Sequence, residues 1–427
     1  MSTVLNIENV RADRLSNGLM VISERMPHVR SVTAGIWVVA GSRHETRGEN
    51  GISHFIEHMV FKGTARRTAA DIARETDSLG GNLDAYTSKE LVCFNCKVLD
   101  QHLPRAFDIL SDMALHPTFA GEDIDKEKGV VLEEIKMEKD TPEYVIHDIF
   151  SSSFWKGHAL GKPILGTNAS IKRLDRNTIR GFYERNYVPS NLVIAAAGNL
   201  THEQLMALAQ ESFGGLAPAA APIPTPAPAP NPELIFKNKR SLEQVHICIG
   251  VPCYELPHAM RYPMYVLNTI LGGGMSSRLF QTIRETHGLA YSVMSEQFLY
   301  RDSGCLSVYA GTSLASVPEV VRLTMAEFRS LKDTPVPADE LQRAKDHLKG
   351  SFMLGLESTT SRMSHLARQH IYFGRFSTMD EILDAVEAVT AEDVQRLANE
   401  FFQTEKIAVT VLGRLDGFQI GRESLVC

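Results

Sequence analysis

The chain lacks the features that mark membrane-spanning and secreted proteins. No apolar run in its 427 residues reaches the 18 or so that a membrane-spanning helix needs. Residues 1–6 do not place a charged region ahead of an apolar stretch, so we expect no secretory leader. The six cysteines are too sparse for a disulfide framework and lie at positions 93, 96, 248, 253, 305 and 427. These absences predict a cytoplasmic protein.

The chain also lacks a basic run. It has 44 Lys+Arg against 51 Asp+Glu, which gives a formal net charge of −7. Proteins that follow a phosphate backbone do so with clustered lysine and arginine, so we expect no nucleic-acid partner. A mildly acidic enzyme attracts cationic peptides, but a charge of this size on so long a chain is also ordinary solvation.

Length and composition predict two domains. A chain of 427 residues exceeds what one hydrophobic core usually supports, and its hydrophobic content of 44% is ample for two. A Pro/Ala-rich stretch at 216–232 reads as a semi-rigid linker between domains at 1–215 and 233–427. Both halves repeat one order of strands and helices, which indicates duplication.

The pattern of each half predicts an α+β fold, in which an antiparallel-rich sheet is covered by helices. In the first half we expect strands at 19–24, 32–40, 83–87, 91–98 and 192–195.

The segment His54-Phe55-Ile56-Glu57-His58 is the strongest functional signal in the chain. On a helix, a residue and its fourth successor share one face, so His54 and His58 can bind one metal ion with Glu57 beside them. With 15 His and 51 Asp+Glu in the chain, about 0.06 accidental matches to this pattern are expected. The motif therefore predicts a zinc peptidase in which Glu57 is the general base.

A catalytic zinc ion normally has three protein ligands and a water molecule, so one ligand is missing from this motif. An expected helix at 122–140 offers several carboxylates. Spacing alone does not choose among Glu127, Glu133, Glu134 and Glu138, because the orientation of that helix is not known from the sequence.

The order of the motif selects a family. It reads H-x-x-E-H, the inverse of the common zinc-peptidase helix. Around it stand Gly41-Ser42-Arg43, Gly51-Ile52-Ser53 and Met59-Val60-Phe61-Lys62-Gly63-Thr64. Together these residues resemble the mitochondrial and bacterial processing peptidases, which are pitrilysin-like zinc metallopeptidases of the insulinase superfamily. The resemblance runs from about residue 19 to about residue 412.

The resemblance implies a complete metal site. The family pattern places its glutamate ligand about 76 positions after the second histidine, which corresponds to Glu134. The implied zinc ligands are therefore His54, His58 and Glu134. Glu127 matches the family's auxiliary glutamate, which supports the metal site by contacting a ligand and not the metal itself. The other interpretation of Glu127 is a solvated carboxylate on the surface of the helix.

The resemblance also implies where a peptide substrate binds. Residues 80–87 resemble the family's edge strand, which pairs with the peptide backbone, so Asn82, Asp84 and Ala85 are expected to bind substrate. Asp84 departs from the pattern, because the family often has asparagine there. In the second half, Arg284 and Tyr291 resemble an arginine/tyrosine pair near the scissile peptide, with Tyr291 donating to the developing oxyanion. Their other interpretation is a surface ion pair and the start of a strand.

In short-chain members of the family, one polypeptide forms half of a clam-shaped chamber. The second half of this chain lacks an H-x-x-E-H motif but carries the arginine/tyrosine pair. The resemblance therefore implies a homodimer, in which the catalytic half of one chain meets the second half of its partner.

Two functions from different classes follow. The first is a zinc endopeptidase that hydrolyses extended, unfolded peptides or leader segments. The second is a non-catalytic scaffold or partner subunit of the same fold, and an intact His54, Glu57, His58 and Glu134 disfavours it.

Overall fold

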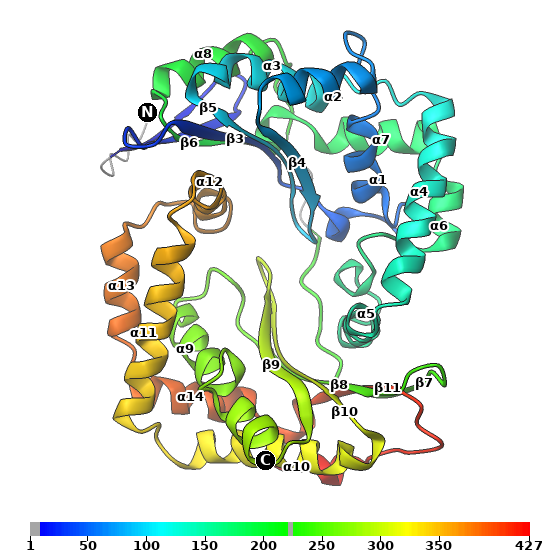
Figure 1. Ribbon diagram of the computed structural model, residues 1–427, viewed down its shortest axis with the longest axis vertical. Coiled ribbons are helices and arrows are strands. Elements are labelled where there is room, and N and C mark those ends of the chain that lie inside the picture. The colour runs from blue at the N-terminus through cyan, green and yellow to red at the C-terminus, as the bar shows by residue number, and fades with distance from the viewer. Residues whose placement is uncertain (1–8, 221–224) are drawn as a thin grey trace. The chain divides into compact units, whose positions relative to one another are not determined.

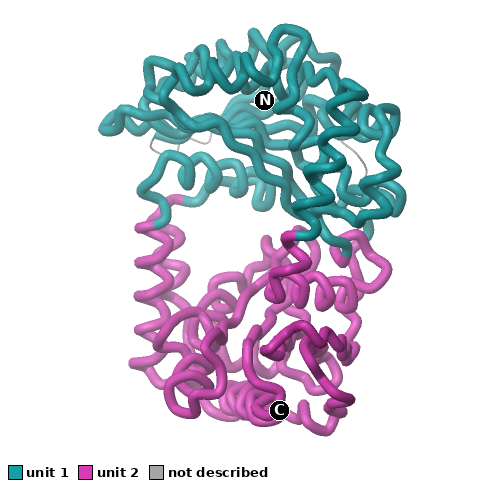
Figure 2. Tube along the Cα trace, turned by 45° about the vertical axis from the view of Figure 1, so that its right-hand side comes forward, with its two compact units in different colours: residues 1–136, 162–226, 355–377 teal, residues 137–161, 227–354, 378–427 magenta. Residues whose placement is uncertain are grey.

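A computed structural model describes residues 9–220 and 225–427, and residues 221–224 of the expected linker lie outside them. The described chain divides into two compact units, coloured separately in Figure 2. Unit 1 comprises residues up to 136, 162–226 and 355–377, and unit 2 comprises residues 137–161, 227–354 and 378–427. No helix in the described part of the chain has the length and apolarity that crossing a membrane requires.

Unit 1 is built on a six-stranded mixed sheet in the order β1-β2-β6-β3-β5-β4. Its strands are β1 (Val10–Arg14), β2 (Met20–Arg25), β3 (Ser31–Val38), β4 (Asn82–Thr87), β5 (Val92–Leu99) and β6 (Leu192–Gly198). Its helices are α1 (Ile52–Val60), α2 (Ala69–Ser78), α3 (Leu103–Leu115), most of α4 (Gly121–Lys139), α6 (Asn168–Arg173), α7 (Arg176–Asn186), α8 (His202–Phe213) and α12 (Thr359–Arg368). Figure 1 shows α3 and α8 on one side of this sheet and α12 on the other.

Unit 2 is built on a five-stranded mixed sheet in the order β7-β11-β8-β10-β9. Its strands are β7 (Leu234–Asn238), β8 (Val245–Cys253), β9 (Ala290–Leu299), β10 (Gly304–Thr312) and β11 (Ala408–Gly413). Its helices are α5 (Pro142–Phe154), α9 (Arg261–Gly272), α10 (Val317–Asp333), most of α11 (Ala338–Gly355), α13 (Met379–Glu387) and α14 (Ala391–Phe401).

The two sheets share one topology. If the five strands from β2 to β6 and the five from β7 to β11 are each counted along the chain, their order across the sheet is first, fifth, second, fourth, third in both. In each sheet only the first of these pairs is parallel, β2 with β6 and β7 with β11, and the others are antiparallel. The α+β fold with two matching halves is therefore confirmed, and the expected strands lie within two residues of the observed starts.

Two helices each pack in the unit that is formed mainly by the other half of the chain. Helix α12 comes from the second half of the chain, yet it packs on β3 and β6 of unit 1. Helix α5 comes from the first half, yet it packs on β8 and β11 of unit 2. Hydrophobic periodicity identifies such helices but does not state which sheet they cover.

A glycine on each central strand permits this close packing. A Cβ atom on Gly35 of β3 would lie 2.8 Å from Met363 Sδ of α12. A Cβ atom on Gly250 of β8 would lie 2.3 Å from Phe150 Cζ of α5. Both contacts are shorter than packed atoms tolerate, so each helix depends on the missing side chain.

The motif helix α1 is fixed by its apolar face. Phe55, Ile56 and Met59 are buried in the core of unit 1, together with Phe94 of β5 and Val38 of β3. His54, Glu57 and His58 occupy the other positions of the same two turns. Burying a side chain of Phe or Ile size contributes roughly 1.5–3 kcal/mol, so the core holds the histidine-bearing face at a defined angle.

Candidate metal centre

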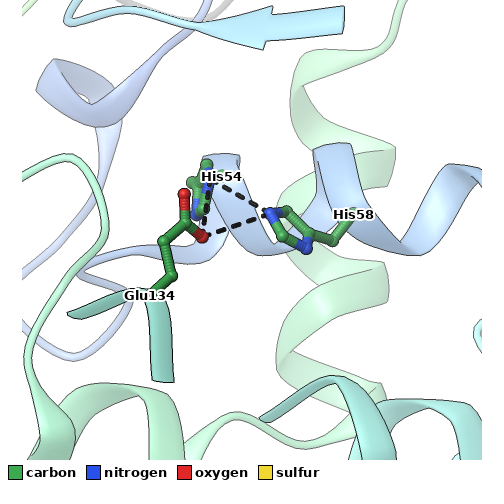
Figure 3. Close-up of side chains that lie close together, drawn as sticks. All are labelled: His54, His58 and Glu134. Atoms are coloured by element: carbon green, nitrogen blue, oxygen red, sulfur yellow. Dashed lines mark hydrogen bonds and ion pairs between the residues drawn. The ribbon is translucent and has the colours of Figure 1, made fainter. Parts of the chain in front are cut away.

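Helices α1 and α4 bring three potential ligand atoms together (Figure 3). His54 Nε2 and His58 Nε2 are 3.2 Å apart. Glu134 Oε2 lies 3.7 Å from His54 Nε2 and 3.5 Å from His58 Nε2. The three side chains point toward one another from two helices separated by 60 residues of sequence.

This triangle fits the ligand shell of a zinc ion. Ligand distances of 2.0–2.2 Å in a tetrahedral zinc site separate neighbouring ligand atoms by about 3.4 Å. Glu134 Oε2 is buried and has no hydrogen-bond partner among the described residues, although two imidazole nitrogens face it. A buried carboxylate oxygen of this kind is costly unless a cation neutralises it. The donor set, two imidazoles and one carboxylate, is one that catalytic zinc uses.

Burial prepares His54 for metal binding. Its pKa is lowered to about 3, first by burial and then by the neighbouring His58. The ring is therefore neutral at pH 7, and a neutral imidazole can offer a nitrogen lone pair to a metal.

His58 is hydrogen-bonded to a buried carboxylate that in turn pairs with a lysine. Glu127 Oε1 accepts a hydrogen bond from His58 Nδ1 at 2.8 Å, and its other oxygen lies 2.7 Å from Lys62 Nζ. The Glu127 side chain is only 4% exposed. A carboxylate on the far nitrogen of a histidine ligand fixes the tautomer and the ring orientation, which leaves Nε2 free to coordinate.

Glu57 is held beside the same site. Thr87 Oγ1, at the end of β4, donates a hydrogen bond to Glu57 Oε2 at 2.5 Å. Burial raises the pKa of the Glu57 carboxyl, whereas the Thr87 hydrogen bond and His58 pull the pKa down. A carboxylate held in this way beside the candidate ligands is positioned to accept a proton from water.

The expected substrate strand lies at the edge of its sheet. Strand β4 pairs with β5 and ends the strand order of the sheet. Asn82 and Asp84 are exposed on the same strand face, and Ala85 on the opposite face is partly buried against the core. Asp84 Oδ1 accepts a hydrogen bond from the Ala85 backbone N–H at 2.9 Å.

Arg284 and Tyr291 belong to unit 2 and contact each other there. Arg284 lies in a π-helical segment, Phe280–Thr286, and its Cζ stands 4.6 Å from the centre of the Tyr291 ring. Tyr291, near the start of β9, is 78% exposed. Arg284 also has Glu285 at 3.6 Å, so the surface ion pair of the other interpretation is present as well. A role for this pair beside the metal stays a prediction.

Two residues that contact the side chains of this site were not singled out from the sequence: Lys62 and Thr87. Lys62 follows His58 by four positions, so helical spacing could have placed the two on one face. Thr87 meets Glu57 through a contact between residues 30 positions apart, for which the sequence carries no periodic signal.

Solved structures share this fold. A protease from Helicobacter pylori superposes with a TM-score of 0.88 at 21% identity, covering 95% of this chain and 99% of its own. A Pseudomonas fluorescens structure, described as a peptidase M16 inactive domain, gives a TM-score of 0.89 at 20% identity over 95% and 98% of the two chains. At this identity the likeness concerns the fold alone.

Sequence comparison defines the family. Residues 20–168 match the model of the insulinase family (peptidase family M16), and residues 173–348 match the model of the peptidase M16 inactive domain. The uncharacterized zinc protease YmxG of Bacillus subtilis is 40% identical over 93% of this chain and 96% of its own. An uncharacterized zinc protease of Streptomyces coelicolor is 39% identical over 97% and 92% of the two chains. The chain belongs to the peptidase M16 (insulinase) family, which confirms the resemblance drawn from its motifs.

Proposed function

We propose that the chain is a zinc metalloendopeptidase that cleaves extended, unfolded peptides or leader segments. The observation that carries this proposal is the convergence of His54 Nε2, His58 Nε2 and Glu134 Oε2, with Glu57 on the same helix face. Relatives named zinc proteases, at about 40% identity over almost the whole chain, support it. A complete ligand set and base argue against a scaffold that only binds.

The residues of the chain divide the chemistry between them. His54, His58 and Glu134 would hold the zinc ion, which supplies Lewis acidity and lowers the pKa of bound water toward about 7. Glu57 accepts the proton of the attacking water and returns it to the leaving amine. Thr87 holds the Glu57 carboxylate in place, and Glu127 holds the ring of His58.

Substrate recognition is proposed to use the backbone of β4. An extended peptide that pairs with a free sheet edge gains main-chain hydrogen bonds irrespective of its sequence. The backbone of Asn82, Asp84 and Ala85 would then pair with the bound segment, and their side chains would stand above and below it. Strand pairing of this kind requires an unfolded substrate and gives loose sequence specificity.

We further propose a homodimer in which Arg284 and Tyr291 of one chain serve the metal site of its partner. Support comes from their mutual contact and from the exposure of Tyr291, whose hydroxyl is available to a developing oxyanion. A fully active monomer would contradict this arrangement.

The test compares cleavage of a basic, extended peptide of about 15–20 residues by the wild type, Glu57→Gln and His58→Ala, with zinc measured in each. We expect cleavage by the wild type alone, zinc retained in Glu57→Gln, and zinc lost from His58→Ala. Activity in Glu57→Gln would refute the assignment of the base. An inactive wild type that carries no zinc would favour the scaffold.

A further inference from the structure

The start of helix α1 is held by a residue outside the helix. The helix begins at Ile52 after Gly51, which has no side chain to cap it, and no acidic residue stands in its first turn. The first backbone N–H groups of a helix have no intrahelical partner and carry partial positive charge. The sequence of α1 itself therefore leaves this end without the usual stabilisation.

Glu45 meets this need from six residues upstream. Its Oε2 accepts from Gly51 N–H at 2.8 Å, and its Oε1 accepts from Ser53 N–H at 2.9 Å. Asn50 Nδ2 adds a third donor to Oε2 at 3.3 Å. The residue is only 5% exposed. A single buried carboxylate thus satisfies two backbone donors at the end of the helix that carries His54.

The surrounding backbone restricts this end further. Gly51 has φ +93°, a conformation that favours glycine, and a Cβ atom there would lie 2.7 Å from Leu165 O. Asn50 Nδ2 also donates to Pro163 O at 3.0 Å. The first turn is therefore clamped between Glu45 on one side and residues 163–166 on the other.

From these contacts we propose that Glu45 is a positioning residue, which holds the first turn of α1 so that His54 meets His58 and Glu134 around the metal. The inference rests on the metal site of the proposed function. His54 immediately follows Ser53, whose N–H Glu45 binds, so fraying of this turn moves the His54 ring directly. His58, one turn further along, is held separately by Glu127.

The chemistry of Glu45 is unusual for a residue that serves stability alone. Burial raises its pKa to about 7, against the hydrogen bonds from Ser53 and Gly51. Ionising a buried carboxyl opposes folding, whereas an ordinary Ser or Thr cap stabilises a helix without a buried charge. Helix α8 of the same unit has such a cap, Thr201, which accepts from Gln204 N–H.

This contrast supplies a matched control. Glu45→Gln keeps the shape of the side chain but replaces one acceptor with a donor that faces a backbone N–H. Thr201→Ala removes the cap of a helix that carries no metal-site residue. Zinc affinity of each zinc-free protein is measured at pH 8 by competition with a chromophoric chelator, and thermal unfolding is measured in parallel.

We expect Glu45→Gln to bind zinc about tenfold more weakly than the wild type, as loss of outer support for a ligand typically does. Thr201→Ala should lower the unfolding temperature and keep wild-type zinc affinity. Amide hydrogen exchange should accelerate at residues 51–55 in Glu45→Gln and at 202–206 in Thr201→Ala. Glu45→Asp, which keeps the charge but is one methylene shorter, replaces Glu45→Gln if that variant fails to fold, and a smaller loss of affinity is expected.

The outcomes separate the two proposals. Tight zinc binding by the wild type with equal affinity in the Glu45 variant and Thr201→Ala would overturn the role of Glu45 and leave the proposed function standing. Failure of the wild type to bind zinc would overturn the proposed function, and the role of Glu45 with it.

Discussion

Removing the carboxylate of Glu127 should weaken zinc binding without removing any proposed ligand. In Glu127→Gln, His58 Nδ1 loses a charged acceptor at 2.8 Å, and Lys62 loses its ion-pair partner at 2.7 Å. The Glu127 side chain is 4% exposed, so water does not replace these contacts easily. The His58 ring then has less restraint on its orientation and tautomer.

The expected size of the effect follows from the position of Glu127. Removing the group that supports a histidine ligand typically lowers metal affinity 10–100-fold, which is about 1.4–2.7 kcal/mol. We expect the lower part of this range, because a glutamine oxygen can still accept from His58 Nδ1. Lys62 is left beside a neutral amide, but it is partly exposed and can turn to solvent.

The assay is a zinc competition titration of zinc-free Glu127→Gln, with Glu133→Gln as the matched control. Glu133 lies on the same helix with its side chain 72% exposed and pairs with Lys136. The control should bind zinc as the wild type does, because an exposed pair of this kind is worth little. Equal zinc affinity in both variants would refute the support role of Glu127.

Three further predictions concern other parts of the molecule. Mixing inactive Glu57→Gln and Tyr291→Phe chains should restore up to about a quarter of wild-type activity. Random exchange makes about half of the dimers mixed, and each mixed dimer of the proposed kind has one intact site of its two. No recovery after subunit exchange would contradict a shared site. Gly250→Ala should lower the free energy of unfolding by about 1–3 kcal/mol, because its Cβ would lie 2.3 Å from a side chain of α5. Gly350→Ala in α11 should raise the free energy of unfolding by about 0.5–1 kcal/mol, because no atom lies within 4 Å of the added Cβ and alanine favours a helix over glycine. Urea unfolding of both variants measures the two changes. The folded-state pKa of Glu45 is raised from 4.5 to about 7, so between these pH values the folded protein binds this proton more tightly than the unfolded chain does. The free energy of unfolding of the zinc-free wild type should therefore fall relative to that of Glu45→Gln as pH rises from 4.5 to 7, by up to about 1.4 kcal/mol per pH unit. The same pH dependence of the unfolding free energy in both proteins would contradict the buried charge.

Local sequence pattern was enough for five of the six strands of unit 1, β2 to β6, but it did not give β1. The expected strand at 83–87 corresponds to β4, and the expected helix at 122–140 corresponds to α4. Periodicities of two and 3.6 residues are set by backbone geometry, so they are legible without tertiary information. The repeated order of strands and helices likewise anticipated the shared topology of the two sheets.

Local sequence pattern could not predict which sheet each helix packs against. The amphipathic sequences of α5 and α12 state that one face is buried, but not which sheet buries it. The sheet faces they cover depend on contacts between residues far apart in the sequence, such as Thr33 with Thr360, 327 positions later. Only the glycines at 35 and 250 indicate close approach of a helix, and a glycine within a strand is equally typical of a bulge or a sharp bend.

The candidate site divides in the same way. Helical spacing placed His54 and His58 on one face, but four carboxylates of α4 remained open until a resemblance chose Glu134. The structure turns Glu134 Oε2 toward both imidazoles, whereas Glu133 on the same helix is exposed. The rotation of α4 about its axis is fixed by tertiary packing of Val131 and Ile135 in the core, which spacing along one helix does not encode.

The most direct test of the central claim is zinc-edge anomalous scattering from crystals of the zinc-loaded protein. We predict one zinc ion per chain, bound by His54 Nε2, His58 Nε2 and a Glu134 carboxylate oxygen. A zinc ion bound elsewhere, or none at these residues in a protein that cleaves peptides, would contradict the proposed metal centre.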